Sequence, residues 1–457
     1  MDTVRINEKD NVLVDLDSGH KVAADRIKED SDIIKYGFPI GAATCDIEKG
    51  ERVHSHNMKT KLGGLLCYEY TPDFSLPEKE EPFMIKAFER ENGEIGIRND
   101  IWIVPTVGCV NSAAKAIAER TGAIAFSHPY GCSQLGGDME TTQLILKGLI
   151  THPNAGGVLV LGLGCENNHI GEMKKVLGDV SQRRIRFLNA QDCEDEIAEG
   201  IKIIGELKEI AAQDKRSSVP VSRLKVGLKC GGSDGFSGIT ANPTVGRVTD
   251  RLCAMGASAV LTEVPEMFGA ETVLFERCIN EEVFRKGVKL INDFKEYFRS
   301  HGEPVSENPS PGNKDGGITT LEEKSLGCVQ KGGSAPVVDV LTYGDRVTKP
   351  GLSLLNGPGN DIVSVTNLSA AGCHLVLFTT GRGTPLGGAV PTVKIATNDS
   401  LAQRKKGWID FTASSFDTKK AAEELLTLIK EVADGKQTKN ELCSSREIAI
   451  FKDGVTL

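Results

Sequence analysis

IWIVPTVGCVNSAAKAIAERTG, residues 101–122, decides the fold of most of this chain. Its first half is an apolar run that ends in glycine, and its second half is an alanine-rich amphipathic segment that also ends in glycine. This order predicts a buried strand followed by a helix with a glycine just beyond its end. Residues 121–153 and 156–178 repeat the order. Strands that alternate with helices predict an open α/β sheet.

In such a sheet, the loops beyond the carboxyl ends of the strands collect the ligand. Here those loops are residues 106–109, 128–134 and 164–168, which are rich in polar and small residues. They form a site hypothesis for this part of the chain. The glycine-rich stretches match neither the phosphate-loop nor the dinucleotide-binding signature, so a nucleotide enzyme is disfavoured.

The rest of the chain divides around these units. In residues 1–72, glycine and proline recur every few residues, which predicts a small β-rich head of short strands and tight turns. Residues 73–95 carry prolines and charges and read as a linker. Residues 96–215 form the second domain, and residues 216–457 form a C-terminal domain that opens with another apolar strand. The predicted fold class is α/β, a β head followed by two Rossmann-like, open-sheet domains.

Composition excludes several classes of function. The 457 residues carry a formal net charge of −9 from intermixed acids and bases, so nothing favours a nucleic-acid partner. The apolar runs are far shorter than the roughly 20 residues of a membrane helix. The opening MDTVRINEKD lacks the apolar core of a signal peptide. We therefore expect a cytoplasmic protein with no membrane partner, and a homo-oligomer is compatible with this composition.

Twelve cysteines in such a chain are expected to be mostly free thiols. The sequence contains no Cys-x-x-Cys pair, which argues against a zinc ribbon or a thioredoxin-like couple. A cubane iron–sulfur cluster assembled from dispersed cysteines stays open. Core packing explains most of the twelve equally well, because a free cysteine behaves as a small hydrophobe.

His54-Ser55-His56 is the first candidate for a metal site. In an extended segment, alternate residues point to the same side, so the two imidazoles can face one ion. The alternative is two surface histidines on a polar turn, because a divalent transition metal normally takes three or more protein ligands.

Long stretches of this chain resemble the altronate dehydratase and galactarate dehydratase family. Among them are YGFPIGAAT, VHSHN, HPYGCSQ, GGSDGFSGITANPTVG, TEVPEMFGAE, NGPGNDIVSVTNLSAAG, FTTGRGTPLG and the ending REIAIFKDGVTL. The resemblance spans the whole chain and implies an N-terminal β-clip domain of the SAF type followed by two α/β domains. In the related sulfolactate sulfo-lyases, head and body are separate chains, so their fusion here favours the sugar-acid branch.

The resemblance also implies a function, a metal-dependent hydro-lyase of hexuronate catabolism that dehydrates a sugar acid. Fe²⁺ is the expected ion, and Mn²⁺ or another divalent ion is the alternative. The expected substrate is D-altronate, converted to 2-dehydro-3-deoxy-D-gluconate, with galactarate as the alternative. A catalytically silent sugar-acid-binding protein is the alternative from a different class.

The chemistry of such a reaction sets the groups to look for. A base must remove the proton next to the carboxylate, and an acid must assist departure of the hydroxyl. A divalent cation can stabilise the enediolate as a Lewis acid. We assign the metal first to His54 and His56, which the resemblance favours over two surface histidines. Cys165 and Glu166 are assigned as further ligands, with a proton donor or a capped strand end as the alternative.

Four residues are candidates for the catalytic groups. His128 and Cys132 share the His-Pro-Tyr-Gly-Cys-Ser-Gln loop and could supply a base or further ligands, although a histidine before proline is often a turn residue. Glu263 and Glu266 come just after a buried strand, and one of them suits an acid or a ligand, with a helix cap as the alternative. Glu263 is assigned as the catalytic candidate. Lys394 is predicted on a buried strand, where burial would lower its pKa toward that of a base. The alternative for Lys394 is a side chain that reaches from a strand edge to water.

Three residues are candidates for holding the substrate. Arg382, in Thr-Gly-Arg-Gly-Thr-Pro, could grip a carboxylate in a bidentate fork, although such loops also occur merely as tight turns. Asp234, in a glycine-rich turn, suits a hydroxyl or a metal, with a self-bonded turn as the alternative. Asn360 is assigned to the same group.

Overall fold

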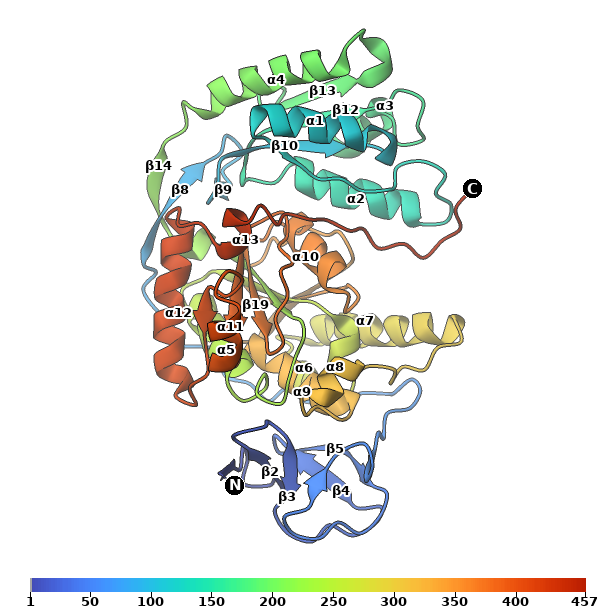
Figure 1. The fold of residues 1–457 in the computed structure, drawn as a ribbon, viewed down its shortest axis with the longest axis vertical. Helices are drawn as coiled ribbons and strands as arrows, with labels where there is room; N and C mark the ends of the chain where they lie inside the picture. The colour runs from blue at the N-terminus through green and yellow to red at the C-terminus, as the bar shows by residue number, and fades with distance from the viewer. Residues whose placement is uncertain (1) are drawn as a thin grey trace.

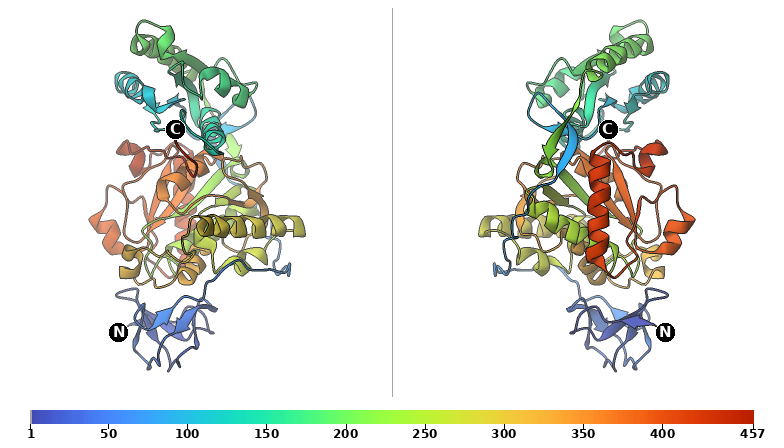
Figure 2. Two further views of the ribbon diagram at one scale, coloured as in Figure 1. Left: turned by 90° about the vertical axis from the view of Figure 1, so that its right-hand side faces the viewer. Right: turned by 90° about the vertical axis from the view of Figure 1, so that its left-hand side faces the viewer.

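The computed structural model describes residues 2–457 as three parts arranged in a row (Figure 1). A small head of antiparallel strands lies at one end, the C-terminal α/β domain in the middle and the second α/β domain at the other end. Two further views show the same order (Figure 2). The predicted succession of a β-rich head and parallel-sheet α/β domains is confirmed.

The head contains two antiparallel sheets, with strand orders β1-β2-β3-β6 and β4-β5-β7. Ile33, Ile40 and Val53 are fully buried and join the core beneath these strands. The strands are β1 Thr3–Val4, β2 Val12–Asp15, β3 Lys21–Ala23, β4 Asp32–Lys35, β5 Phe38–Ala43, β6 Arg52–Val53 and β7 Met58–Lys59.

The His54-Ser55-His56 stretch is a turn, and our expectation of an extended segment is wrong. β6 ends just before it and β7 begins just after it. The buried Asn57 makes the turn, because its side-chain oxygen accepts a hydrogen bond from the His54 N–H at 2.9 Å. The two imidazoles therefore do not follow the alternation of a strand.

Two buried lysines join the head to the C-terminal domain. The Nζ atoms of Lys21 and Lys35 lie 2.7 and 2.9 Å from the two carboxylate oxygens of Glu323, near the start of α9 (Leu321–Cys328). Burial favours the neutral acid, but the two ammonium groups outweigh it and lower the pKa of Glu323 to about 2. Because a buried charge is tolerated only when it is paired, these contacts hold the head in one position.

The segment predicted as a linker is only partly without regular structure. Residues 60–83 contain neither helix nor strand. Beyond them, β8 (Met84–Glu89) and β9 (Ile95–Gly96) form a small antiparallel sheet with β14 (Arg216–Pro220). The alternation of β8, with every second side chain buried at Ile85 and Ala87, explains why this part packs as a strand.

The second domain is a four-stranded parallel sheet, in the order β11-β10-β12-β13, with helices on its faces. α1 ends at a glycine, Gly122, in the left-handed conformation, as the sequence predicts. The elements are β10 Asp100–Pro105, α1 Asn111–Thr121, β11 Ile124–Ala125, α2 Asp138–Ile150, β12 Ala155–Gly162, α3 Ile170–Leu177, β13 Ile185–Asn189 and α4 Glu196–Ala211.

The C-terminal domain is a seven-stranded parallel sheet, in the order β17-β18-β16-β15-β19-β20-β21. Its inner strands are buried along their whole length, which explains their continuous apolar runs. The strands are β15 Lys225–Cys230, β16 Ser258–Leu261, β17 Val337–Leu341, β18 Gly351–Leu355, β19 Leu375–Thr380, β20 Thr392–Ala396 and β21 Phe411–Thr412. Besides α9, the helices are α5 Ala241–Ala254, α6 Glu271–Phe275, α7 Glu281–Ser300, α8 Pro311–Asp315, α10 Asp361–Ala370, α11 Asp399–Arg404, α12 Thr418–Ala433 and α13 Lys439–Leu442.

The two α/β domains share one apolar core through α2 and α10. At Gly148 on α2, a Cβ atom would lie 2.4 Å from the Ala370 carbonyl oxygen, so the close approach of the helices requires glycine. The C-terminal tail adds a second link, because Asp453 and Gly454 donate backbone hydrogen bonds to the Asp138 carboxylate at 2.9 and 2.8 Å. Among residues 2–457, none of the helices has the length and apolar character that a membrane crossing requires.

Candidate active site

The carboxyl edge of the seven-stranded sheet carries a buried cluster of acids, lysines and thiols. β15 ends in Lys229 and Cys230, and Glu263 follows the end of β16 by two residues. Glu266 lies in the 3₁₀ turn that comes next, and Cys328 is the last residue of α9. All five side chains are buried, so the cluster is built at the place where a parallel sheet presents its loops.

Two thiols and one carboxylate meet in this cluster. The sulfur atoms of Cys230 and Cys328 are 3.2 Å apart. Both lie against the same oxygen of Glu266, at 3.2 and 3.0 Å. Among the described residues, these three form the single group of at least three His, Cys, Asp or Glu ligand atoms that all lie within 4.8 Å of one another.

Lysines surround this group. The Nζ atom of Lys331 donates a hydrogen bond to Cys230 Sγ at 2.8 Å, and Lys324 Nζ lies 2.9 Å from the second oxygen of Glu266. Burial favours the neutral acid, but Lys324 and the other lysines hold the pKa of Glu266 well below its ordinary value. The hydrogen bond with Cys230 and burial raise the pKa of the Cys328 thiol well above its ordinary value.

A second acid of the cluster, Glu263, has a strained backbone and a different electrostatic setting. Its φ of 72° lies in the left-handed region, which side chains other than glycine rarely adopt. Its carboxylate contacts Lys229 Nζ and accepts a hydrogen bond from the Cys230 N–H at 3.0 Å. Burial and the charge of Glu266 raise the pKa of Glu263. Two neighbouring acids with pKa values shifted in opposite directions are typical of acid–base sites.

Lys229 connects the buried cluster to the surface. Its Nζ atom lies 2.9 Å from Asp361, the first residue of α10, whose side chain is 35% exposed. Three ammonium groups, of Lys229, Lys324 and Lys331, thus lie next to three carboxyl groups, of Glu263, Glu266 and Asp361.

This donor set suits a divalent transition metal. Thiolates with one carboxylate favour ions such as Fe²⁺ or Zn²⁺ over Mg²⁺ or Ca²⁺, which prefer oxygen alone. Metal binding releases the thiol protons. Because two protons would leave as one divalent ion arrives, the balance of charge around Cys230, Glu266 and Cys328 would be unchanged. The group can therefore hold a metal without further compensation.

Arg382 lies on the rim of the same edge, and Lys394 is buried in the middle of β20, the strand next to β19. Arg382 follows β19, is exposed, and its guanidinium makes no hydrogen bond or ion pair within residues 2–457. Its backbone N–H donates to the Gly232 carbonyl at 2.9 Å, so the loop leans on the end of β15. Lys394, on β20, donates to the Thr384 carbonyl at 2.9 Å, and burial lowers its pKa to about 8.

Asp234 and Asn360 serve the backbone around them. Asp234 accepts hydrogen bonds from the N–H and the hydroxyl of Ser237, each at 3.0 Å, and from Thr397 at the end of β20. This is the self-bonded turn that we gave as the alternative. Asn360 is the N-cap of α10, with its side chain accepting from the Val363 N–H at 3.2 Å, and it is exposed beside Asp361.

The four predicted metal ligands do not come together. His54 and His56 lie in the head, whereas Cys165 and Glu166 lie in the second domain at the far end of the molecule (Figure 1). The His54 ring donates from Nε2 to the Lys314 carbonyl at 2.9 Å, and His56 is exposed. The assignment of these four to one ion is wrong, because it joined loops of different domains.

Glu166 has a local structural role. One of its carboxylate oxygens accepts from Thr106 Oγ1 at 2.5 Å, and the other accepts from the Gly164 N–H at 2.6 Å. Burial opposes ionisation, but these hydrogen bonds outweigh it and lower the pKa of Glu166. The side chain therefore closes the end of β12, which is the alternative that the sequence left open.

His128 is likewise engaged by its own loop. Its Nε2 donates to the Pro105 carbonyl at 2.8 Å, and its Nδ1 accepts from the Tyr130 N–H at 3.2 Å. The ring is buried, and burial lowers its pKa. Both ring nitrogens of His128 are thus engaged within its own loop, as in the turn residue given as the alternative. Cys132, in the same loop, is half-buried and donates to Asn167 Oδ1 at 3.2 Å.

Sequence reasoning chose one side chain of the buried cluster, Glu263, and weighed Glu266 beside it. It missed the ligand pair Cys230 and Cys328 and the lysines next to them. A local signal existed at β15, because Lys229-Cys230 directly follows the apolar residues 226–228 and precedes two glycines. Cys328 carried no comparable signal, because it is a helix residue about a hundred positions further along the chain.

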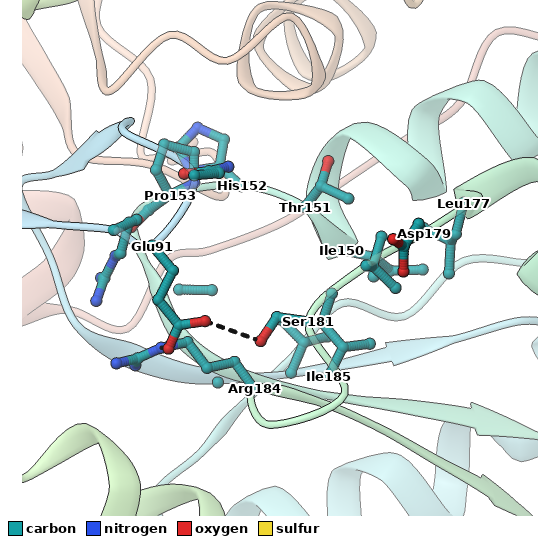
Figure 3. Close-up of a pocket in the computed structure, with 16 residues that line it drawn as sticks. Glu91, Ile150, Thr151, His152, Pro153, Leu177, Asp179, Ser181, Arg184 and Ile185 are labelled. Carbon is teal, nitrogen blue, oxygen red and sulfur yellow. Dashed lines mark hydrogen bonds and ion pairs between the residues drawn. The ribbon is translucent and has the colours of Figure 1, made fainter.

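A separate cavity of about 340 Å³ lies at the opposite edge of the second domain (Figure 3). His152 and Pro153 precede β12, and Arg184 precedes β13, so the cavity borders the amino ends of these strands. Ser181 donates to Glu91 across it at 3.3 Å. None of the predicted site residues is among the described residues that line it.

The geometry describes an α/β protein with an acid, lysine and thiol centre at the carboxyl edge of its larger sheet. Comparison with known families divides the chain in the same way. Residues 14–61 match the altronate/galactarate dehydratase SAF domain. Residues 87–212 match the D-galactarate dehydratase/altronate hydrolase second domain, and residues 221–456 match the D-galactarate/altronate dehydratase C-terminal domain.

Curated relatives agree over nearly the full length. The chain is 55% identical to an altronate dehydratase of Bacillus subtilis (strain 168), covering 97% of this chain and 93% of the relative. It is 52% identical to an altronate dehydratase of Escherichia coli (strain K12), covering 99% and 94%. A galactarate dehydratase (L-threo-forming) of Escherichia coli is 33% identical, covering 92% and 86%. The chain belongs to the altronate/galactarate dehydratase family.

Proposed function

We propose that this protein is a hydro-lyase that dehydrates D-altronate to 2-dehydro-3-deoxy-D-gluconate in hexuronate catabolism. The observation that carries the proposal is an identity above 50% to altronate dehydratases over nearly the whole chain. The buried centre supports it, because acids, amines and a metal-binding group stand together where a parallel sheet presents its site. Galactarate is the second candidate substrate, since the galactarate dehydratase relative is 33% identical.

Arg382 is the proposed anchor of the substrate carboxylate. It is exposed on the loop that leans on Gly232, and a guanidinium can grip a carboxylate through two parallel hydrogen bonds. The half-buried Asp361, held by Lys229, lies on the same edge and can accept a hydrogen bond from a substrate hydroxyl. The substrate would thus lie over the ends of β15 and β19, next to the buried centre.

Lys394 and Glu263 are the proposed base and acid. Lys394 has a pKa lowered to about 8, so a useful fraction of its amine is neutral near physiological pH. Lys394 and Lys229 flank the same aromatic ring, with their Nζ atoms 4.9 and 5.8 Å from the centre of Phe378. Glu263, whose pKa is raised, can give a proton to the departing hydroxyl.

Cys230, Glu266 and Cys328 are the proposed metal ligands, and Fe²⁺ is the proposed ion. A divalent ion held there supplies a Lewis acid for the enediolate. Lys331 donates a hydrogen bond to Cys230 Sγ at 2.8 Å, so an ammonium group stands beside this proposed ligand. A catalytically silent protein that only binds a sugar acid would not need these groups. Binding requires neither two thiol ligands nor two acids whose pKa values are shifted in opposite directions.

The test is an anaerobic assay of protein loaded with ferrous or manganous ion, offered D-altronate and galactarate in parallel. We expect formation of a 2-keto-3-deoxy acid from D-altronate that chelator abolishes. Glu266→Gln and Cys328→Ser should lose both the bound ion and turnover. His54→Ala with His56→Ala, which removes the imidazoles of the head, should retain the ion. Turnover of neither acid by the ion-loaded protein would overturn the proposed function.

A further inference from the structure

We propose that Cys109, Cys132 and Cys165 together bind a cubane iron–sulfur cluster at the carboxyl edge of the second domain. The inference does not rest on the proposed dehydration, and the site is separate from Cys230 and Cys328 in the C-terminal domain. It concerns a cofactor that these thiols would hold through three of its four irons.

The topology brings the three thiols to one edge. Cys132 follows β11, Cys109 follows β10 and Cys165 follows β12, and the sheet places these strands side by side in that order. The strands are parallel, so their carboxyl ends point the same way. Each cysteine comes directly after a glycine, and Cys109, Cys132 and Cys165 lie four, seven and three residues beyond the ends of their strands.

Direct contacts lock the three loops against one another. The Gly108 N–H donates to the Tyr130 carbonyl at 2.9 Å, and the Asn168 N–H donates to the Gly131 carbonyl at 3.0 Å. Gly131 has a φ of 102°, and a Cβ atom there would lie 1.9 Å from the Thr106 carbonyl oxygen. Only glycine permits this approach, so the residue before Cys132 is pressed onto the loop that leads to Cys109.

A side-chain contact ties the second thiol to the third loop. Asn167 Oδ1 accepts from Cys132 Sγ at 3.2 Å and from the Ser133 N–H at 3.0 Å. Cys165 lies two residues before Asn167, and its sulfur accepts a hydrogen bond from Gln191 Nε2 at 3.4 Å. Hydrogen bonds to the sulfurs of an iron–sulfur cluster tune its potential, so this amide has a role beside a bound cluster.

Core packing does not explain the two exposed cysteines, Cys109 and Cys165. Cys132 is half-buried and packs against the core of the second domain, with its thiol turned to Asn167. Cys193 makes the contrast, because it follows the next strand, β13, and its thiol donates to the backbone carbonyls of Asn189 and Ala190 at 3.6 and 3.5 Å. The thiol at that fourth strand end is thus occupied locally.

A single ion held by all three thiols would need their sulfur atoms to converge, as the ligand atoms of Cys230, Glu266 and Cys328 do within 4.8 Å. Among the described residues the three thiols do not form such a group. A cubane cluster does not need this convergence, because it binds each thiolate through a different iron. Cys109 lies just before the N-terminus of α1, whose dipole favours the negative charge of a thiolate-bound cluster.

Assembly of the cofactor balances in atoms and charge. Two ferrous ions, two ferric ions and four sulfide ions make one [4Fe–4S]²⁺ core, and three thiol protons leave as the thiolates bind. Three protein ligands leave one iron open to an oxygen ligand from water or a hydroxy acid. The chemical class of the cofactor is therefore a three-thiolate [4Fe–4S] cluster.

The test is anaerobic reconstitution of the full-length protein with ferrous ion, ferric ion and sulfide, followed by desalting and chemical analysis. We expect about four sulfides per chain with a broad visible absorption that dithionite bleaches. Cys109→Ser, Cys132→Ser and Cys165→Ser should each lose most of the sulfide, and Cys193→Ser should keep it. Circular dichroism of each variant checks that the loss does not reflect unfolding.

A double variant separates this inference from the proposed function. Cys230→Ser with Cys328→Ser should keep the sulfide and the visible band while losing the ion of the buried centre. Reconstituted wild type with iron but no sulfide would overturn the cluster and leave the buried metal site standing. Sulfide retained by the triple variant of Cys109, Cys132 and Cys165 would overturn it as well.

Discussion

The two parallel sheets of this protein present reactive side chains at corresponding places but in opposite surroundings. At the carboxyl edge of the larger sheet, α9 and the 3₁₀ turn that holds Glu266 cover lysines, acids and two thiols. At the same edge of the smaller sheet, Cys109 and Cys165 remain exposed. Burial requires that every charge be paired, so the first edge contains opposed ammonium and carboxylate groups. The second edge, where Cys109 and Cys165 face solvent, has no such requirement and can present exposed thiols.

Because one sheet edge is buried and the other is exposed, we expect different chemistry at each. A buried and water-excluded centre can shift pKa values strongly and hold a single metal ion. An open edge with spaced thiols suits a larger cofactor that brings its own charge. Five changes test whether the contrast is real, beginning with the largest expected effect.

Glu263→Gln should remove the proposed acid of the buried edge with little change in shape. We expect kcat for D-altronate to fall by about 10²–10⁴-fold, the usual contribution of a positioned proton donor. The matched control is Glu271→Gln, which breaks the buried pair with Lys295 at 2.7 Å and lies outside the centre. The control should lose stability while keeping kcat per folded molecule. Equal losses of kcat in both variants would mean that Glu263 is structural.

Glu323 tests whether burial at the head requires paired charge. Its pKa is about 2 in the folded protein against 4.5 ordinarily, which corresponds to about 3 kcal/mol of stability. Because the folded pKa is the lower one, this stability is present above pH 4.5 and is lost as the pH falls toward 2. Thermal unfolding across this window should show the loss in the wild type.

Unfolding of Glu323→Gln should be measured over the same pH range and compared with the wild type. That variant should be less stable at pH 7, because Lys21 and Lys35 lose their partner, and its unfolding should lose the acid dependence contributed by this carboxyl group. An unchanged acid dependence in the variant would show that the pair with the two lysines does not anchor the head.

Arg382→Ala should weaken substrate binding at the rim of the buried edge. A charge-assisted bidentate contact is worth about 1.5–3 kcal/mol, so kcat/KM should fall about 10- to 100-fold, mainly through KM. Arg382→Lys should recover only part of the loss, because an ammonium lacks the planar fork. Arg404→Ala, another exposed arginine, is the control and should leave steady-state kinetics unchanged. A wild-type KM in Arg382→Ala would remove the residue from the site.

Lys394 predicts a pH profile. A lysine acts as a base in its neutral form, so kcat should rise about tenfold between pH 7 and pH 9, through the lowered pKa of about 8. Lys394→Arg, which keeps the charge, should abolish the rising limb. A profile that is flat over this range in the wild type, measured at saturating substrate, would assign the base elsewhere.

Cys165→Ser should have the smallest effect, and it probes the open edge. Because its side chain is exposed, the free energy of unfolding of the cofactor-free protein should change by less than about 0.5 kcal/mol. Cys328→Ser, at the buried edge, should cost clearly more, because Sγ contacts both Cys230 and Glu266. Denaturant unfolding compares the two. Equal costs would erase the contrast between the edges.

Local patterns predicted the parts of the fold that depend on neighbours along the chain. The apolar run and alanine-rich segment of residues 101–122 are β10 and α1, and the glycine at 122 ends the helix as expected. Periodicity and glycine position are local properties, so a sequence states them directly. Glu263 and Arg382 were selected for the same reason, because each lies in a loop after a recognisable strand.

Local patterns did not predict the environment of side chains whose partners are distant in sequence. They also did not predict that both ring nitrogens of a histidine would form hydrogen bonds within a turn. His54 lies in a turn set by Asn57, and His128 bonds Pro105 and Tyr130. Neither contact follows from the period of the chain. The four residues assigned to one ion lie in two domains. The positions of residues along a sequence do not show how far apart two domains lie in space.

The sequence by itself determined the succession of a β-rich head and α/β domains and the family. Only the tertiary structure decided which thiols meet. Cys230 and Cys328 touch although 98 residues separate them, because α9 folds over the end of β15. The physical reason is that secondary structure follows from neighbouring residues, whereas a buried site follows from which distant segments pack together and pair their charges.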